Sequence, residues 1–247
     1  MTPVTRPDGR AFDELRTLQI IPNTMPFAEG SASIRLGDTH VLCTATVDER
    51  VPAWRRGQGR GWVTAEYGML PRATKERTAR EAVGGRQGGR TVEIQRLIGR
   101  SLRAAVDLKA LGERQVIVDC DVVRADGGTR CAAITGGYVA LAFALYSLRQ
   151  KGRLTRDPLA AAVAGISVGV VRGATLLDLN YVEDSGAAVD CNIIGNDRGD
   201  FIEIQATAEG KPFARRNFED LVDLASLGLA VLFEAQREAI RTGMPAA

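Results

Sequence analysis

The sequence predicts an α+β fold made of two related halves, each a mixed β-sheet with helices. In each half, several short β-prone runs precede a long helix with apolar residues at helical spacing, and strands and helices do not alternate regularly. A polar connector, Lys151–Pro158, separates the two sets. We therefore expect one half at residues 1–150 and the other at 151–247. The chain lacks G-x-G-x-x-G and G-x-x-x-x-G-K-[ST] motifs, which argues against the usual nucleotide-binding loops.

The first half begins with strand patterns. Ser31–Leu36 and His40–Val47 are β-prone runs separated by Gly37-Asp38, a good turn pair, so they predict a hairpin. Trp62–Leu70 is a third candidate strand, and Gln115–Val123 has the composition of a buried strand.

A long loop and two helices complete the first half. Pro71–Arg90 is polar, glycine-containing and basic, which predicts a long exposed loop, and such loops are usually functional or disordered. An apolar stripe at helical spacing predicts a helix at about Thr91–Leu108, and an Ala-, Leu- and Val-rich run predicts another at Cys131–Gln150.

The second half repeats the pattern. Its candidate strands are Val163–Val171, Ala174–Asn180, Val189–Ile194 and Phe201–Ala208. A long helix is then predicted at about Phe218–Arg241, with Asn217 as its N-cap.

The charge of the chain is unevenly distributed. Residues 55–103 hold twelve basic and four acidic side chains, a local balance of +8, whereas the whole chain carries only +2. Such segregation indicates a polyanionic partner for this segment. Nearly all of its basic residues are arginines, whose planar guanidinium binds phosphate in a bidentate way.

Cysteine and histidine usage argues against several other chemistries. The four cysteines lie far apart with no CxxC pair, which predicts buried reduced thiols and no zinc site. The single histidine, His40, is interpreted as structural. The first residues lack the apolar run of a secretory signal, and the longest apolar stretch, Tyr138–Leu148, is shorter than the roughly 20 residues that a bilayer requires. We expect a soluble, cytoplasmic protein with no membrane association.

The segment Asp126-Gly-Gly-Thr-Arg130, between a predicted strand and a predicted helix, is a candidate phosphate site. Glycines allow close backbone approach, and a helix N-terminus offers unpaired N–H groups and the positive end of its dipole. Thr129 adds a hydroxyl and Arg130 a charged guanidinium. The alternative is an ordinary tight turn with Thr129 as the helix N-cap.

A second candidate is the segment Asp178-Leu-Asn-Tyr-Val-Glu-Asp184. Because a strand ends near Asn180 and a turn follows, Asp178 and Asp184 are expected to converge at one sheet edge. Two carboxylates without a histidine suit a hard cation such as Mg²⁺. Glu183 and Asp190 are weaker members of this cluster, and the alternative is a solvated acidic loop.

A series of arginines is the third candidate, and its functional interpretation is a track for an RNA backbone. Its members are Arg72, Arg77, Arg80, Arg86 and Arg90 in the loop, and Arg96, Arg100 and Arg103 on one face of the predicted helix. The alternative for the helix arginines is a solvated face paired with acids. The glycine-rich setting of Arg86 and Arg90 favours phosphate contact.

Taken together, these segments resemble the ribonuclease PH family of bacterial phosphorolytic exoribonucleases, which are related to polynucleotide phosphorylase and to the exosome ring. The matching motifs occur in the right order over almost the whole chain: Arg6–Arg10, Val41–Val47, Trp62–Leu70, Gly89–Ala104, Asp119–Arg130, Ala133–Gly136 and Asp178–Gly186. The resemblance implies a fold like ribosomal protein S5 domain 2, used twice, and a homohexameric ring arranged as a trimer of dimers.

The resemblance also implies an activity and its residues. Gly128, Thr129 and Arg130, with Arg86, would bind the inorganic phosphate that acts as co-substrate. Asp178 and Asp184 would be catalytic and hold Mg²⁺. The RNA 3′ end would be held by basic residues, namely Arg72, Arg77, Arg80, Arg90 and Arg96. Family members trim tRNA precursors beyond the 3′ CCA end, release nucleoside diphosphates, and can add nucleotides in the reverse reaction.

Two rival functions remain at the level of the sequence. One is a non-catalytic RNA-binding ring subunit, which would typically lack the acid or the phosphate positions, whereas both are present here. The other is a hydrolytic nuclease that uses the same aspartates and would release monophosphates without added phosphate.

Overall fold

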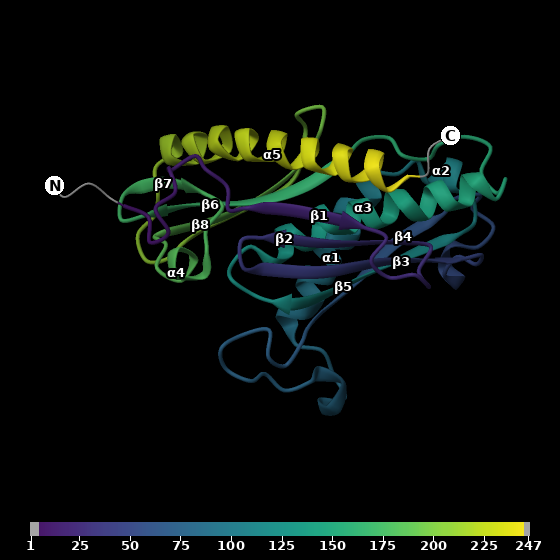
Figure 1. Cartoon of the computed structure of the whole chain (residues 1–247), viewed down its shortest axis with the longest axis horizontal. Coiled ribbons are helices and arrows are strands. Elements are labelled where there is room, and N and C mark those ends of the chain that lie inside the picture. Colours follow the sequence, from purple (N-terminus) through teal and green to yellow (C-terminus); the bar gives the residue numbers. More distant parts are fainter. Residues whose placement is uncertain (1–4, 245–247) are drawn as a thin grey trace.

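In the computed structural model, which describes residues 5–244, the chain forms two β-sheets with helices packed against them (Figure 1). The first sheet has the strand order β1-β2-β3-β5-β4, and β4 runs parallel to β5 while all other neighbours are antiparallel. Its strands are β1 (Leu18–Pro22), β2 (Gly30–Leu36), β3 (Thr39–Asp48), β4 (Trp62–Met69) and β5 (Gln115–Arg124).

The second sheet is antiparallel throughout, with the order β7-β6-β8-β9. Its strands are β6 (Val163–Val171), β7 (Ala174–Leu177), β8 (Val189–Asn196) and β9 (Phe201–Ala208). Each predicted half therefore contributes one sheet, in agreement with the predicted α+β fold of two halves with a sheet in each.

Three long helices hold the sheets together. They are α1 (Gly89–Ala104), α3 (Thr129–Gln150) and α5 (Arg215–Gly243). Helix α1 packs on β4, α3 packs on strands of both sheets, and α5 runs along one side of the molecule over β1 and the second sheet (Figure 1). The remaining helices are short: η1 (Ala53–Arg55), η2 (Glu81–Gly84), α2 (Leu108–Leu111) and α4 (Tyr181–Asp184).

One continuous hydrophobic core joins the two halves. It includes Val118 of the first sheet, Ile166 of the second, and Ile134 of α3 between them. Helix α3 is apolar on every side, and among the described residues it alone is long and apolar enough to cross a membrane; 89% of its apolar window is buried inside this fold. A helix that is hydrophobic all round is expected at the centre of a protein core.

Most of the predicted elements are confirmed. The β2–β3 hairpin turns between Leu36 and Thr39, and all four cysteines are buried and free. Burial raises the pKa of Cys191 to about 12, so this thiol stays protonated. The imidazole of His40 bonds to the Ser33 hydroxyl on the neighbouring strand at 2.8 Å, in keeping with a structural role.

Local backbone chemistry explains the differences from prediction. The helix expected to reach Leu108 ends at Ala104, because the Asp107 carboxylate accepts N–H bonds from residues 109 and 110 and starts a separate helix, α2. Strand β7 ends at Leu177 because Asp178 takes a left-handed conformation, with φ 52°. The N-cap of α5 is Ala214, and Asn217 bonds back to it from inside the first turn. Strand β1 was not predicted.

The N-terminal segment reaches across to the second sheet. The Leu177 N–H donates to the Phe12 carbonyl at 2.8 Å, and the buried Arg6 guanidinium bonds to both carboxylate oxygens of Glu183 at 2.8 Å. Residues at the start of the chain thus fix the segment that carries the candidate acids.

Candidate active site

A cleft of about 710 Å³ opens where the start of α3 meets α4 and β8. Its charged and polar lining comes from both halves of the chain. The lining includes Lys75, Arg90, Asp126, Thr129, Arg130, Asp184, Asp190 and Asn192. The predicted phosphate segment and one of the two predicted aspartates therefore face the same space.

The turn before α3 has a backbone that requires glycine. Gly127 and Gly128 have φ of 75° and 66°, in the left-handed region. A Cβ added to Gly127 would lie 2.6 Å from the Leu179 carbonyl oxygen, so the turn packs directly against the segment leading into α4. Gly128 is the N-cap of α3, and no side chain caps the first N–H groups there. These N–H groups are free to bind an anion.

Thr129 and Arg130 are each held by a partner from another element. Thr129 is the first residue of α3, not its N-cap, and its hydroxyl lies 2.9 Å from the Tyr67 hydroxyl on β4. The Arg130 guanidinium donates to Gln205 on β9 at 2.8 Å and lies 3.4 Å from a Glu93 oxygen on α1. The simple N-cap alternative is thus wrong, and Arg130 is oriented by contacts with both halves.

Two carboxylates share the opposite wall of the cleft. Asp184 ends α4, a single turn whose start is fixed by a capping box between Asn180 and Glu183. Asp190 lies on β8. Burial raises the pKa of Asp184, against the opposing effect of Arg90 and Arg130. Burial, and then the charge of Asp184, raise the pKa of Asp190. The acid that accompanies Asp184 on this wall is Asp190, which the sequence marked only as a weak member of the cluster.

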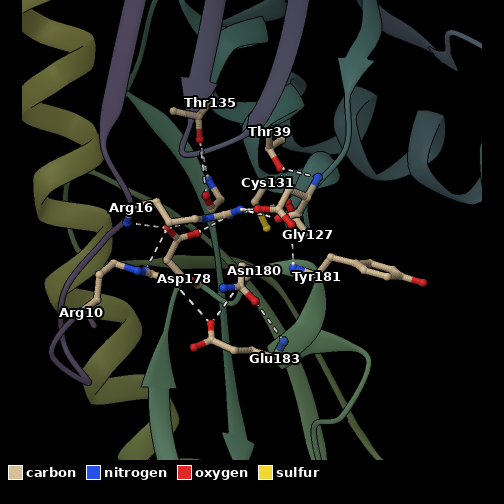
Figure 2. Close-up of polar contacts among 12 residues, drawn as sticks. Arg10, Arg16, Thr39, Gly127, Cys131, Thr135, Asp178, Asn180, Tyr181 and Glu183 are labelled. Atoms are coloured by element: carbon tan, nitrogen blue, oxygen red, sulfur yellow. Dashed lines mark hydrogen bonds and ion pairs between the residues drawn. The ribbon is translucent and has the colours of Figure 1, made fainter. Parts of the chain in front are cut away.

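Asp178 is bonded to Arg16 (Figure 2), whereas Asp184 lines the cleft, so the two predicted aspartates do not both face that space. Asp178 is 1% exposed and does not line the cleft. Both of its carboxylate oxygens accept bonds from the Arg16 guanidinium, at 2.7 and 2.9 Å, and one also accepts the Arg16 backbone N–H at 2.8 Å. A buried carboxylate needs such a partner, and here the pairing uses the oxygens that a metal would require.

The arginine loop divides between two neighbouring clefts. Arg90, at the start of α1, lines the cleft described above and also an adjoining one of about 810 Å³. Arg80 and Arg86 line only the adjoining cleft. The predicted grouping of Arg86 with Gly128, Thr129 and Arg130 is therefore not seen in this chain.

The path of the loop explains the position of Arg86. The Glu81 carboxylate accepts bonds from the Gly88 N–H at 3.1 Å and the Thr91 hydroxyl at 2.7 Å. Residues 81–91 are thereby folded back on the start of α1, with Arg86 exposed between these two anchors.

The other predicted RNA-binding arginines lie outside the main cleft. Arg72, Arg77 and Arg96 are exposed, and Arg72 borders a separate surface hollow beside β2 and β3. On the exposed side of α1, Arg100 pairs with Glu203 of β9, which is the alternative that the sequence left open for the helix arginines.

Sequence reasoning missed several residues of the site. Lys75 lines the cleft, but in the sequence nothing distinguishes it from the other charged residues of the same loop. Thr39 accepts the Asp126 N–H at 3.0 Å and donates to the Gly127 carbonyl at 2.6 Å, so it holds the phosphate turn from β3 (Figure 2). Arg16 was also missed, because only the structure shows that it is buried, and buried arginine requires a charged partner, here Asp178.

The donor set of the cleft fits a magnesium ion. Within residues 5–244 no group of three or more His, Cys, Asp or Glu side chains is arranged for a metal. Mg²⁺, however, keeps several waters and is usually held by one or two carboxylates together with substrate phosphates. Asp184 and Asp190 match that requirement, because both are half-buried, line the cleft and form no ion pair within the described part of the chain.

Comparison with known structures places the fold. An exosome from Archaeoglobus fulgidus with RNA bound to its active site superposes with a TM-score of 0.78 at 24% identity, over 93% of this chain and 91% of that one. Rice (Oryza sativa) Rrp46 gives 0.77 at 19% identity, over 95% and 100% of the two chains, and an archaeal exosome core gives 0.73 at 24%, over 94% and 91%. The chain thus has the same α+β fold as these proteins.

The sequence itself identifies the family. The profile of the 3′ exoribonuclease family, RNase PH domain 1, matches residues 14–145, more than half of the chain. The chain belongs to this family. The S5 domain 2-like α+β fold that the resemblance implied is confirmed.

Proposed function

We propose that the protein is a phosphorolytic 3′→5′ exoribonuclease that trims tRNA precursors beyond the 3′ CCA end. The observation that carries this proposal is the cleft in which an uncapped helix N-terminus and Arg130 face Asp184 and Asp190. One wall suits a free phosphate, and the other suits a hard cation and proton transfer. Such a pairing is what phosphoryl transfer needs, because it depends mainly on positioning and charge neutralisation.

The phosphate co-substrate is assigned to the first turn of α3. The N–H groups after Gly128 and the guanidinium of Arg130 bind it, and Arg90 adds positive charge from α1. The family resemblance adds Arg86 to this set. Since Arg86 lies in the adjoining cleft of the same chain, its contribution requires a loop movement or a neighbouring subunit.

The reaction joins this phosphate to the last nucleotide of the RNA. A phosphate oxygen attacks the phosphorus of the terminal phosphodiester, the bond from phosphorus to the 3′ oxygen breaks, and a nucleoside diphosphate leaves. The shortened RNA gains a proton on its 3′ oxygen. Whichever of Asp184 and Asp190 is not bound to the metal ion can deliver that proton, because burial raises the pKa of both carboxyls.

Asp184, with Asp190, would hold Mg²⁺, and Asp178 supports that site through the segment that it anchors. When bound, the ion supplies charge neutralisation at the two phosphoryl groups. Arg90 and Arg130 provide a further offset to the repulsion between the phosphate and the RNA backbone.

The exposed arginines supply the RNA-binding surface of this proposal. Arg72, Arg77, Arg80 and Arg96 lie outside the reaction cleft and suit contacts with the backbone of the tRNA body. The family resemblance implies a homohexameric ring, and the similar solved structures belong to exosomes, which are assemblies of this fold. The presence of both the phosphate and the acid walls favours an active subunit over a non-catalytic one.

The test is a 3′-extended tRNA incubated with the protein and Mg²⁺, with phosphate present or omitted. We expect nucleoside diphosphates only when phosphate is present, and incorporation of labelled phosphate into them. Monophosphates released without phosphate would identify a hydrolytic nuclease instead. RNA binding with no nucleotide release under either condition would identify a non-catalytic ring subunit.

A further inference from the structure

We propose that Arg16 is a positioning residue that couples the phosphate turn to the acid-bearing segment and so sets phosphate and Mg²⁺ affinity together. This inference rests on the proposed function. Arg16 does not line the cleft, and it is 6% exposed, so it acts through its neighbours.

The first half of the coupling is the bond network to Asp178. Arg16 donates to Asp178 through its backbone N–H and two guanidinium nitrogens, at 2.7–2.9 Å. Asp178 has a left-handed backbone, with φ 52°, a conformation that aspartate adopts more readily than most non-glycine residues. The three bonds fix its carboxylate at the point where β7 leads into α4.

The second half of the coupling runs to the phosphate turn. The Arg16 guanidinium also bonds to the Asp126 carbonyl oxygen and lies 3.5 Å from the Gly127 carbonyl oxygen. Gly128 packs against the same side chain, since a Cβ added there would lie 3.2 Å from an Arg16 nitrogen. One planar guanidinium thus touches both segments (Figure 2). Lysine cannot reproduce this, because its ammonium is a single point.

Two further contacts connect the phosphate turn to β3 and to α4, so that a shift of the turn would also shift the start of α4. Thr39 holds the other side of the turn, through the Asp126 N–H and the Gly127 carbonyl. The Asp126 carboxylate accepts the Tyr181 N–H at 3.2 Å, at the start of α4. The direction of the first N–H groups of α3 and the position of Asp184 are therefore linked through two half-buried bonds of Thr39 and one exposed bond of Asp126.

This arrangement predicts a specific kinetic pattern. If Arg16 positions both walls, its loss displaces them relative to each other, and a displacement near 1 Å can lower activity by about 100-fold. We expect Arg16→Lys and Arg16→Met to raise the KM for phosphate about tenfold and the Mg²⁺ concentration for half-maximal activity by a similar factor. RNA affinity should change by less than about twofold, because the exposed arginines are untouched.

The experiment compares Arg16→Lys, Arg16→Met, Asp178→Asn and the double variant Arg16→Met with Asp178→Asn. Phosphate and Mg²⁺ affinities are also measured from the concentration dependence of the melting temperature, which needs no turnover. Because the two side chains form one network, the double variant should lose little more affinity than either single variant.

Gln236→Met serves as the control for lost stability, and Thr39→Val serves as a second test of how the phosphate turn is held. Gln236 is buried, bonds to the Thr135 and Val163 carbonyls, and lies outside the cleft, so its loss weakens the fold without moving the walls. It should lower the amount of active protein and leave both affinities unchanged. Thr39→Val removes the second hold on the turn with little change of shape, and it should raise the phosphate KM even if Arg16→Met does not fold.

Additive losses in the double variant, or Arg16→Lys with wild-type KM values, would overturn the proposal. The proposal would also be overturned if the Arg16 variants lost activity only in proportion to the amount of folded protein and kept wild-type phosphate and Mg²⁺ affinities, which is the result expected for Gln236→Met. A wild-type protein that binds phosphate but releases no diphosphate would refute the proposed function alone, since the melting measurements still test the coupling.

Discussion

Burial separates two aspartates that the sequence presents alike. Asp178 and Asp184 belong to one acidic segment, yet Asp178 is neutralised by Arg16 behind the cleft and Asp184 faces the open space. Asp190, from strand β8, lines the cleft beside Asp184, in the position that the sequence assigned to Asp178. Carboxylates can be recognised from sequence as a group, but which of them remains free depends on an arginine more than 160 residues away.

The raised pKa values of Asp184 and Asp190 predict a pH-dependent response to magnesium. A carboxyl whose folded pKa lies above its unfolded value stabilises the fold at low pH, and this contribution is lost as pH rises through the folded pKa. Bound Mg²⁺ should restore that loss. At saturating Mg²⁺ we expect the melting temperature to rise on the order of 5 °C at pH 7.5 and by less at pH 5, because the raised pKa of each carboxyl makes protons compete with the ion more strongly as pH falls.

Differential scanning calorimetry with and without Mg²⁺ checks this response. Asp184→Asn should abolish the increase at both pH values, and it should melt higher than the wild type in the absence of metal at pH 7.5. An equal increase at pH 5 and 7.5 would mean that Mg²⁺ binds elsewhere.

At the scale of elements, the helix ends and the contacts that close the loops determine where the site residues lie. The sequence located the strand, the glycine turn and the helix α3 to within two residues, because strand composition and glycine spacing are local signals. It could not show that Thr129 bonds to Tyr67 of β4, nor that Thr39 holds the turn, because both contacts bridge elements far apart in the chain. The long basic loop was expected to be exposed, and its closure by Glu81 was not foreseen.

The closure of the loop by Glu81 gives a prediction about RNA binding. Glu81→Ala removes both bonds that fold residues 81–91 against α1, each contributing about 1 kcal/mol. We expect tryptic cleavage between Arg77 and Arg86 to become several-fold faster and the KM for RNA to rise about threefold. The KM for phosphate should rise by less than the KM for RNA, because Gly128 and Arg130 lie outside the loop and only Arg86 and Arg90 lie within residues 81–91.

Glu81→Gln is the matched control for that change. It removes the same negative charge and retains a carbonyl oxygen that accepts both bonds. Gln at this position should therefore behave like the wild type in proteolysis, and equal sensitivity of the Ala and Gln variants would show that charge, not closure, controls the loop.

At the scale of the whole molecule, the two halves share one interior. Periodicity and composition predicted two sheets and the connector between them, but they carry no information on how the halves meet. Helix α3 belongs to the first half and packs on β6 of the second, while α5 of the second half packs on β1 of the first. The candidate site lies where these halves meet, which explains why neither half could define it alone.

This shared interior predicts that neither half folds by itself. Fragments 1–150 and 151–247, expressed separately, should lack a cooperative melting transition, because each would expose one side of the continuous core. Mixed fragments should regain helical circular dichroism and a single transition. A fragment 1–150 that melts cooperatively alone would show that the sheets are independent domains.

The reach of the N-terminal segment across to Glu183 and Asp178 also constrains biosynthesis. Arg6 and Arg16 are translated well before their carboxylate partners, which lie 177 and 162 residues further along the chain. During that interval the guanidinium groups have no counterpart and the anion-binding turn lacks its support. The turn and the acid-bearing segment are therefore expected to reach their final arrangement only after Asp178 and Glu183 have been synthesised.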